Sequence, residues 1–300
     1  MLFVCACGGD SSVKIVGGVE IRNTENTNLL LSSAGLSTPE INRENKTFCS
    51  SVILSDRFLL TAAHCVEQYR NYHTGDIIAV FGNVSDEGRA QRAIAPIKVQ
   101  GIAIHQSYQK ILDRNKLEKV AANDLALLYL ETPVPSPFRA VEIVNQHQNV
   151  SEYTNIVLSG YGVTGGLISD DSGVLRAVDV TKKFESSNTK TIELIGPKLQ
   201  GNRIEENEGG GYVYKESTGG SCKGDSGGPA YIWGNGKFQL LGITAFGDSQ
   251  RLASTPNGPT YCVGASFVTD LRYYSSYLSN AMKAIENGYG KYLLPFYTDF

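Results

Sequence analysis

The chain has little charge of either sign in excess and no long apolar run. No stretch approaches the roughly 18 consecutive apolar residues that a membrane-spanning helix requires, so we expect no transmembrane segment. Lys and Arg number 27 against 30 Asp and Glu, and no five-residue window is rich in basic side chains, which argues against a nucleic-acid partner. The cysteines and histidines lack the spacing of zinc ligands, and no internal repeat is evident, which argues against a zinc site and a repeat architecture.

Glycine is the residue in excess, with 32 in 300 residues, about 11% against a usual ~7%, and this predicts many tight turns. Hydrophobic residues at 41% can form a large core, and 19% charged residues are too few for a disordered chain. Short apolar or alternating runs bounded by Gly, Asn, Asp and Pro are typical of β-strands. They cover residues 51–55, 76–82, 97–105, 124–130, 155–162, 231–247 and 265–269. The sequence therefore predicts an all-β chain.

Local signals divide this β-rich region. Asn235-Gly236 lies between two apolar runs and supplies the positive φ angles of a two-residue hairpin turn. Three prolines in residues 132–137 cannot join a central strand, so we expect this stretch to link two β units. Helical spacing occurs only in residues 271–285, with glycines at 288 and 290 ending it.

The first ten residues are apolar for seven positions and then small and polar, which indicates a targeting segment without a basic start. Val4-Cys5-Ala6-Cys7 before Gly-Gly-Asp resembles a bacterial lipobox, in which Cys7 would carry the lipid anchor. The alternative is a signal peptide that is simply removed. Either way we expect an extracytoplasmic protein, secreted or anchored by lipid. Six cysteines allow fifteen pairings, and an even number remains after this segment, as expected in an oxidising compartment: Cys49, Cys65, Cys222 and Cys262.

Three short motifs carry catalytic residue types. Ser226 lies between glycines in Gly-Asp-Ser-Gly-Gly-Pro (224–229), where a sharp turn exposes a hydroxyl; an ordinary glycine-rich turn is the alternative. His64 precedes Cys65 after an apolar run, whereas the other three histidines are expected to be structural. Asp124 begins a strand. Together these residues offer a nucleophile, a base and an orienting carboxylate.

Residues 160–165 match Gly-x-Gly-x-x-Gly directly after a predicted strand. This pattern suggests a dinucleotide site, but such a site needs a following helix that holds the pyrophosphate, and the sequence after residue 165 predicts a loop.

The order His64, Asp124, Ser226 in these motifs resembles the trypsin/chymotrypsin family of serine proteases. Lys14-Ile15-Val16-Gly17-Gly18 resembles the activation junction of that family's zymogens, and the resemblance covers about residues 15–287. It implies two six-stranded antiparallel β-barrels packed face to face, with a C-terminal α-helix. The expected organisation is a targeting segment and short propeptide at 1–14, a protease domain at 15–288 and an aromatic tail at 289–300. We expect the first barrel at about 15–133 and the second at about 150–288.

The resemblance also implies roles for the site residues. Ser226 would attack the peptide carbonyl, His64 would take its proton, and Asp124 would orient His64. The oxyanion would bind the N–H groups of Gly224 and Ser226. Cleavage after Lys14 by a trypsin-like partner would free the amino group of Ile15 to pair with Asp225. The implied disulfides join Cys49 to Cys65 and Cys222 to Cys262.

The pocket positions implied by the family are uncharged. Gly220 stands at the floor beside Ser221, and Gly247 and Gly264 stand at the walls, which favours an apolar or aromatic residue before the cut. A preference for small residues, as in elastases, is the alternative. Departures from the family are Ala245 for a serine near the aspartate, Phe246 for a tryptophan on the substrate-pairing strand, and Asn83 for the first acidic ligand of a calcium loop. We expect no metal and no cofactor. We expect long loops at residues 109–122 and 187–211.

Two other functions remain open at this stage. A protease-like binding protein without catalysis would usually lose one of the three catalytic residues, which this chain keeps. A dinucleotide-dependent oxidoreductase would bind a nicotinamide cofactor. For a protease we expect a monomer that acts on protein or peptide substrates, whose identity the sequence does not specify.

Overall fold

The computed structural model describes residues 18–287, leaving out 22–27, 72–75, 84–93, 109–121, 152–153, 165–170, 207–211, 248–252, 256–257, 261 and 263. The activation residues Lys14 and Ile15, the cysteine proposed for lipid attachment and the aromatic tail therefore lie outside the described residues. So does nearly all of the predicted loop at 109–122.

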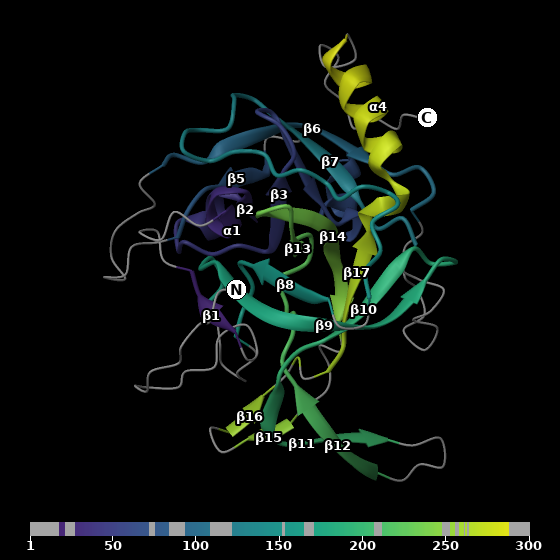
Figure 1. Cartoon of the computed structure of the whole chain (residues 1–300). Helices are drawn as coiled ribbons and strands as arrows, with labels where there is room; N and C mark the ends of the chain where they lie inside the picture. The colour runs from purple at the N-terminus through teal and green to yellow at the C-terminus, as the bar shows by residue number, and fades with distance from the viewer. Residues whose placement is uncertain are drawn as a thin grey trace.

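Six strands form a first closed barrel, drawn in purple and blue in Figure 1. Its strands are antiparallel and follow the order β2-β3-β4-β7-β6-β5. They are β2 (Ser33–Ser37), β3 (Cys49–Ile53), β4 (Phe58–Thr61), β5 (Ile78–Val80), β6 (Ile97–Ile104) and β7 (Ala126–Leu130). Every residue of β3 and β4 is buried: the apolar side chains pack in the cores, and the hydroxyls of Ser50, Ser51 and Thr61 all donate hydrogen bonds to backbone carbonyls.

A second barrel is built by β8 (Asn155–Gly160), β9 (Arg176–Ser186), β10 (Thr191–Ile195), β13 (Pro229–Gly234), β14 (Lys237–Gly247) and β17 (Ser266–Asp270). It closes because β8 pairs with both β9 and β13. The chain's first described strand, β1 (Val19–Glu20), also pairs with β9, so the N-terminal segment joins the second barrel although it precedes the first. The predicted all-β fold with two six-stranded antiparallel barrels is confirmed.

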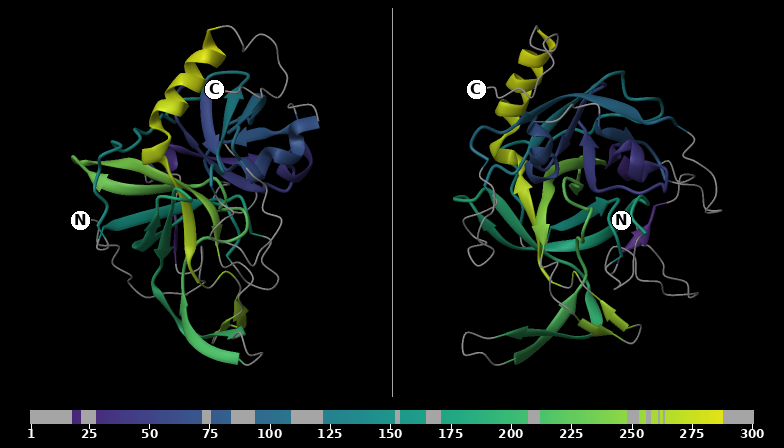
Figure 2. Two further views of the ribbon diagram at one scale, coloured as in Figure 1. Left: turned by 90° about the vertical axis from the view of Figure 1, so that its right-hand side faces the viewer. Right: turned by 180° about the vertical axis from the view of Figure 1, so that it is seen from behind.

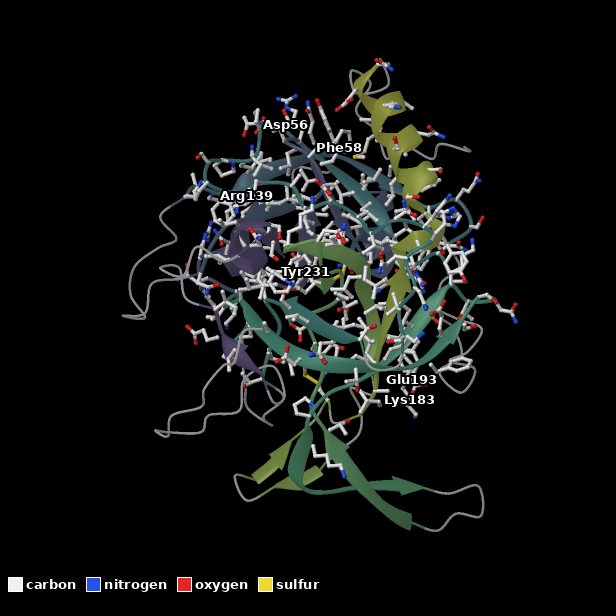
Figure 3. All side chains as sticks on the ribbon, in the orientation of Figure 1. Asp56, Phe58, Arg139, Lys183, Glu193 and Tyr231 are labelled. Atoms are coloured by element: carbon white, nitrogen blue, oxygen red, sulfur yellow. A yellow bond between two sulfur atoms is a disulfide. The ribbon has the colours of Figure 1, made fainter. Side chains whose placement is uncertain are left out.

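The turn chemistry of the second barrel follows the sequence. Asn235 and Gly236 connect β13 to β14 with φ angles of 53° and 75°, which confirms the predicted hairpin. On the neighbouring hairpin, Lys183 of β9 and Glu193 of β10 form a cross-strand ion pair of 3.0 Å (Figure 3).

The two barrels meet along a tightly packed seam. Tyr231 of β13 is fully buried, and its hydroxyl lies 2.7 Å from Ser32 Oγ beside the first barrel (Figure 3). A Cβ on Gly227 would overlap the Thr61 hydroxyl and the Ser50 carbonyl of the first barrel. This contact places the loop before β13 against the ends of β3 and β4.

A short helix, α1 (Asn28–Leu31), precedes the first barrel, and three more lie between its strands: α2 (Pro39–Asn42), α3 (Ala63–Val66) and η2 (Glu67–Asn71). The C-terminal helix is confirmed, but it begins later than the pattern predicts. Residues 271–273 form a 3₁₀ turn, η5 (Leu271–Tyr273), before α4 (Ser275–Glu286), because the Asp270 carboxylate caps Arg272 N–H at 3.0 Å. Figure 2 shows α4 extending from the barrels, with Leu278, Ala281 and Ile285 buried against them.

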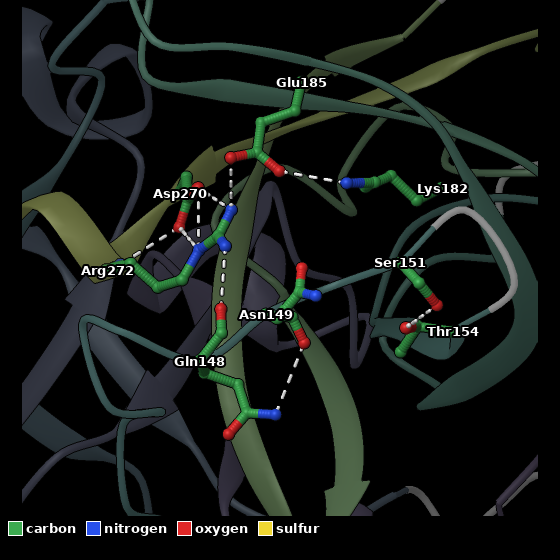
Figure 4. Close-up of polar contacts among 8 residues, drawn as sticks. All are labelled: Gln148, Asn149, Ser151, Thr154, Lys182, Glu185, Asp270 and Arg272. Carbon is green, nitrogen blue, oxygen red and sulfur yellow. Dashed lines mark hydrogen bonds and ion pairs between the residues drawn. The ribbon is translucent and has the colours of Figure 1, made fainter.

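Arg272 fastens this turn to the second barrel. Its guanidinium pairs with Asp270 at 2.6 Å and with Glu185 of β9 at 2.8 Å, and donates to the Gln148 carbonyl at 2.9 Å (Figure 4). Lys182 completes the network by pairing with Glu185 at 3.1 Å.

A separate four-stranded sheet lies at the lower end of the molecule in Figure 1, in the order β12-β11-β15-β16. Its strands are β11 (Lys198–Glu206), β12 (Tyr212–Thr218), β15 (Ala253–Thr255) and β16 (Gly258–Thr260). The expectation of a long loop at 187–211 is thus wrong for two parts of it: β10 pairs with β9 and β17 in the second barrel, and β11 pairs with β12 and β15 in this sheet. No described helix has the length and apolar character needed to cross a membrane.

Candidate active site

His64 is held at the end of a buried strand. The chain leaves β4 at Thr61, and the short helix α3 begins at Ala63. The disulfide between Cys49 and Cys65, with Cα atoms 6.2 Å apart, fixes this helix to β3. The His64 side chain is 31% exposed, so one edge of its ring reaches solvent.

Asp124 lies just before β7 and is 1% exposed. Its Oδ2 is 2.8 Å from His64 Nδ1, and its Oδ1 accepts the backbone N–H of His64 at 3.0 Å. The two contacts fix the imidazole with Nδ1 toward the carboxylate and leave Nε2 for a substrate-side group. This is the arrangement that an orienting carboxylate requires.

The pKa of His64 is raised. Burial lowers it, but the charge of Asp124, its hydrogen bond and the more distant charge of Glu67 together outweigh the burial. The imidazole is therefore a stronger base than a free histidine, which suits proton abstraction near neutral pH.

The surroundings of Asp124 differ from the family pattern. Ala245 is buried and offers no hydroxyl to the carboxylate. Thr269 of β17 instead donates its hydroxyl to the Asp124 backbone carbonyl at 3.4 Å. The aspartate is thus held through its backbone from the second barrel.

Ser226 lies in the turn before β13, and its backbone is tied to the first barrel. The Ser226 carbonyl accepts the Ser50 N–H at 2.8 Å, and the flanking residues Gly224 and Gly227 have φ angles of 92° and 79°. Positive φ and the close approach at Gly227 explain why glycines flank the serine.

Ser226 and His64 both lie beside the Cys65 sulfur, but in the described part of the chain no hydrogen bond joins their side chains. Cys65 Sγ lies 3.6 Å from the Ser226 carbonyl oxygen and 3.9 Å from His64 Nε2. Within the described residues, no hydrogen bond joins the Ser226 hydroxyl to His64. Catalytic hydrogen bonds are often long before substrate binds, so this geometry is compatible with proton transfer.

Asp225, the residue before Ser226, is 2% exposed. Its carboxylate accepts the N–H of Gly162 at 2.9 Å and of Cys222 at 2.8 Å. Burial raises the pKa of Asp225 to about 6, although these two N–H groups and the charge of Arg176 oppose the rise.

The glycines of the Gly-x-Gly-x-x-Gly stretch have a packing role. A Cβ on Gly160 would overlap the Asp225 carboxylate, and one on Gly162 would lie 2.6 Å from the Asp225 nitrogen. Among the described residues after this stretch, the next regular element is the strand β9, so no helix end faces these glycines. The stretch makes room for Asp225 and does not form a dinucleotide site.

Four residues expected to line the substrate pocket lie together with one more, Ser266, which the sequence analysis did not name. The hydroxyl of Ser266 accepts the Ser221 N–H at 2.8 Å and bonds the Ser221 hydroxyl at 3.0 Å. Ser266 pairs with Gly247 in the sheet, and its oxygen would lie 2.5 Å from a Cβ on Gly220. Gly264 precedes β17 and contributes its backbone, bonded to Thr218 at 3.2 Å. The sequence predicted a strand at residues 265–269 but did not indicate which of its side chains faces Ser221.

Phe246 lies beside this region on β14. Its ring stacks on Phe267 of β17, with centroids 4.4 Å apart and planes 11° from parallel. The replacement of the usual tryptophan is thus accommodated by an aromatic pair.

Two positions bear on metal binding. Cys49, His64 and Cys65 place potential ligand atoms within 4.8 Å of one another, but the two sulfurs are joined in a disulfide and are not free thiolates. Asn83 is buried; its amide nitrogen donates to the Ile21 carbonyl and its oxygen accepts the Leu175 N–H at 2.6 Å. Asn83 therefore joins β1 to β9.

The second implied disulfide is also present. Cys222 and Cys262 are bonded, with Cα atoms 5.2 Å apart, and they connect the turn that carries Ser226 to the segment after β16. Both pairings implied by the resemblance are confirmed.

Two six-stranded barrels, with a histidine–aspartate pair on one and a serine in a glycine turn on the other, are the features expected of a serine endopeptidase. Comparison with known sequences gives the family: the sequence model of the trypsin family matches residues 21–266, and the chain belongs to that family. It is 28% identical to brachyurin from Leptuca pugilator over 202 residues, 67% of this chain and 76% of that protein. It is also 28% identical to serine protease SP24D from Anopheles gambiae over 236 residues, 76% of this chain and 72% of the other. Membership of the trypsin family and the two disulfides indicate that the protein is extracytoplasmic.

Proposed function

We propose that this endopeptidase cleaves peptide bonds with His64, Asp124 and Ser226 as its catalytic triad. The observation that carries the proposal is the buried Asp124 carboxylate, which holds both the Nδ1 atom and the backbone N–H of His64. The Cys65 sulfur lies near both of the other residues, 3.9 Å from His64 Nε2 and 3.6 Å from the Ser226 carbonyl oxygen. A protease-like binding protein would have no need of this preserved arrangement.

In the proposed reaction, Ser226 Oγ bonds to the substrate carbonyl carbon while His64 Nε2 takes the hydroxyl proton. Asp124 stabilises the imidazolium that forms. The tetrahedral intermediate breaks its carbon–nitrogen bond, and the leaving amine takes the proton from His64. Water then attacks the carbonyl carbon of the acyl-enzyme and gives a proton to His64. The bond between that carbon and Ser226 Oγ breaks, and Oγ takes the proton back from His64, which releases the acid product and restores the enzyme.

The oxyanion would accept the N–H groups of Gly224 and Ser226. Support comes from Ser50, whose hydroxyl donates to the Gly224 carbonyl at 2.8 Å and accepts the Tyr161 N–H at 2.8 Å. These bonds fix the peptide planes beside the hole. Losing one oxyanion donor typically costs about 3–4 kcal/mol of transition-state stabilisation.

For specificity we propose an apolar or aromatic residue before the cut. Gly220 brings no charge to the floor, and Gly247 leaves the wall without a side chain. The hydroxyls of Ser221 and Ser266 bond each other at 3.0 Å and occupy the space next to Gly220 and Gly247, and this observation supports the second candidate, a preference for small residues.

We further propose that cleavage after Lys14 activates the enzyme by pairing the new amino group of Ile15 with Asp225. Support comes from the buried carboxylate of Asp225, which accepts the backbone N–H groups of Gly162 and Cys222, and from β1, which pairs with β9 close to residue 15 in the chain. An uncharged pocket does not suit cleavage after lysine, so a separate trypsin-like protease would perform it. The lipid anchor at Cys7, the monomeric state and the division into residues 1–14, 15–288 and 289–300 stay predictions.

Labelling with a fluorophosphonate probe tests the proposed function. The protein cleaved after Lys14 should be labelled on Ser226, and the uncleaved protein only slowly; Ser226→Ala is the control that removes the reacting hydroxyl. Failure of the cleaved protein to react would refute the triad. Equal rates before and after cleavage would refute the activation proposal alone. Cleavage of a peptide library by the active form then decides between the two specificities.

A further inference from the structure

A polar cluster lies directly behind the catalytic aspartate, centred on the residue before it. Asn123 Oδ1 accepts the hydroxyl of Tyr274 at 2.9 Å and the ammonium group of Lys190 at 3.4 Å. Its Nδ2 donates to the Ser107 carbonyl at 3.2 Å. One amide thus binds the first barrel, the second barrel and the segment before α4.

Asn123 begins a tight backbone turn that orients the Asp124 side chain. Its φ angle is 64°, a left-handed conformation, and its carbonyl accepts the Leu125 N–H at 2.8 Å across Asp124. Such a tight turn needs support from side-chain contacts to stay in place. Because Ala245 supplies no hydroxyl to the carboxylate, the turn has a larger share in orienting it.

Lys190 is itself held on several sides. It lies in the turn between β9 and β10 with a φ angle of 53°, and its carbonyl accepts the Asp270 N–H at 2.9 Å. Its ammonium group also lies 5.0 Å from the centre of the buried Tyr274 ring. The lysine therefore reaches from the second barrel to the first in a fixed position.

We propose that Lys190 is a positioning residue for catalysis, which holds the Asn123 amide and thereby aims Asp124 at His64 across the seam. The inference rests on the proposed triad. It goes beyond the triad because it adds a cation of the second barrel, Lys190, which supports the catalytic base of the first barrel, His64.

The test compares Lys190→Met with Lys190→Arg in protein cleaved after Lys14, using the rate of fluorophosphonate labelling of Ser226 as a function of pH. The methionine keeps the apolar stem and removes the ammonium group. We expect the maximal labelling rate to fall about 10-fold, since small misplacements of catalytic groups are costly. The probe concentration for half-maximal rate should stay unchanged, and Lys190→Arg should restore most of the rate.

The pH profile separates positioning from stability. The charge and hydrogen bond of Asp124 raise the pKa of His64, so an Asp124 that is aimed less well should let that pKa fall, and the acid limb of the labelling rate should move to lower pH. Glu67 also acts on His64 and is unchanged in the variant. Burial and, to a smaller extent, the charge of Lys190 lower the pKa of His105 to about 4, and the larger cause, burial, remains in the variant.

Lys183→Met is the matched control, because Lys183 lies on the same hairpin but is exposed and pairs with Glu193. It should label like the unmodified protein. A Lys190→Met protein with the original rate and acid limb, or one that loses only thermal stability, would overturn the inference. If Lys183→Met slows labelling equally, the effect is not specific and the inference also falls. Absence of labelling in the unmodified cleaved protein would instead refute the proposed function.

Discussion

Two buried carboxylates in consecutive functional motifs have different partners. Asp124 faces His64, which takes up positive charge during the reaction. Asp225 accepts hydrogen bonds from the backbone N–H groups of Gly162 and Cys222, and burial disfavours its charged form. A carboxylate buried in this way lowers stability when it ionises, unless a cation joins it. The different partners give one aspartate a role in catalysis and the other a role in the proposed activation.

The pKa of Asp225 gives a prediction for the uncleaved protein. Because the folded value of about 6 lies above the ordinary value of 3.8, Asp225 favours folding below pH 3.8, and this contribution is lost as the pH rises through about 6. Asp225→Asn should remove this loss, so that the variant is more stable than the uncleaved parent at pH 7 but not at pH 4. Urea unfolding at both pH values measures the difference.

The same variant should lose activity once cleaved, because the Ile15 amino group would find no charge. Chromatography of the cleaved variant would check that it remains folded. Full labelling of Ser226 in cleaved Asp225→Asn would contradict the activation proposal, and equal stability gains at pH 4 and pH 7 would contradict the electrostatic explanation.

At the scale of elements, the turn from Cys222 to β13 makes the contact between barrels. Gly227 has no room for a side chain against Ser50 and Thr61, and Ser226 is bonded to β3 through its carbonyl. The nucleophile therefore belongs to one barrel in sequence but takes its position from the other. The four-stranded sheet is joined to the same turn, since β12 ends two residues before Gly220.

Gly227→Ala tests this contact. The methyl group would overlap the first barrel and adopt a φ angle of 79°, so we expect a loss of about 1–3 kcal/mol for overpacking besides the backbone strain. Labelling of Ser226 should fall sharply because the turn must move. Thermal unfolding and labelling rate measure the two effects.

Gly236→Ala is its matched control. Gly236 has a φ angle of 75°, but nothing lies within 4 Å of its Cβ position, so only the backbone strain applies. It should cost about 1–2 kcal/mol and leave labelling intact. Equal losses in the two alanine variants would show that Gly227 matters for its conformation alone.

For the molecule as a whole, local patterns predicted the strands, the hairpin at Asn235 and the C-terminal helix, because each depends on neighbouring residues. The resemblance to the family added the barrels and both disulfides. Pairings between distant segments were beyond such patterns. The sheet that joins β11 to β15 is one, and the position of Ser266 opposite Gly247 is another, since a bulge between Thr244 and Phe246 sets that register.

The site follows the same division. The motifs predicted which residues carry the chemistry, but not the contacts that aim them. The Lys190–Asn123 bond joins residues 67 positions apart, and the role of Gly160 and Gly162 depends on Asp225 in another segment. These contacts arise when the two barrels close and pack.

The central claim is that three residues from two barrels act as one catalytic unit, and the combined loss of two of them tests it most directly. The measurement is the turnover rate of protein cleaved after Lys14, compared among Ser226→Ala, His64→Ala and the double variant. Because residues that act as a unit are each needed for the same step, each single variant should reduce the turnover rate about as much as the double variant. Losses that multiply in the double variant, or a single variant that keeps most of the rate, would contradict the account.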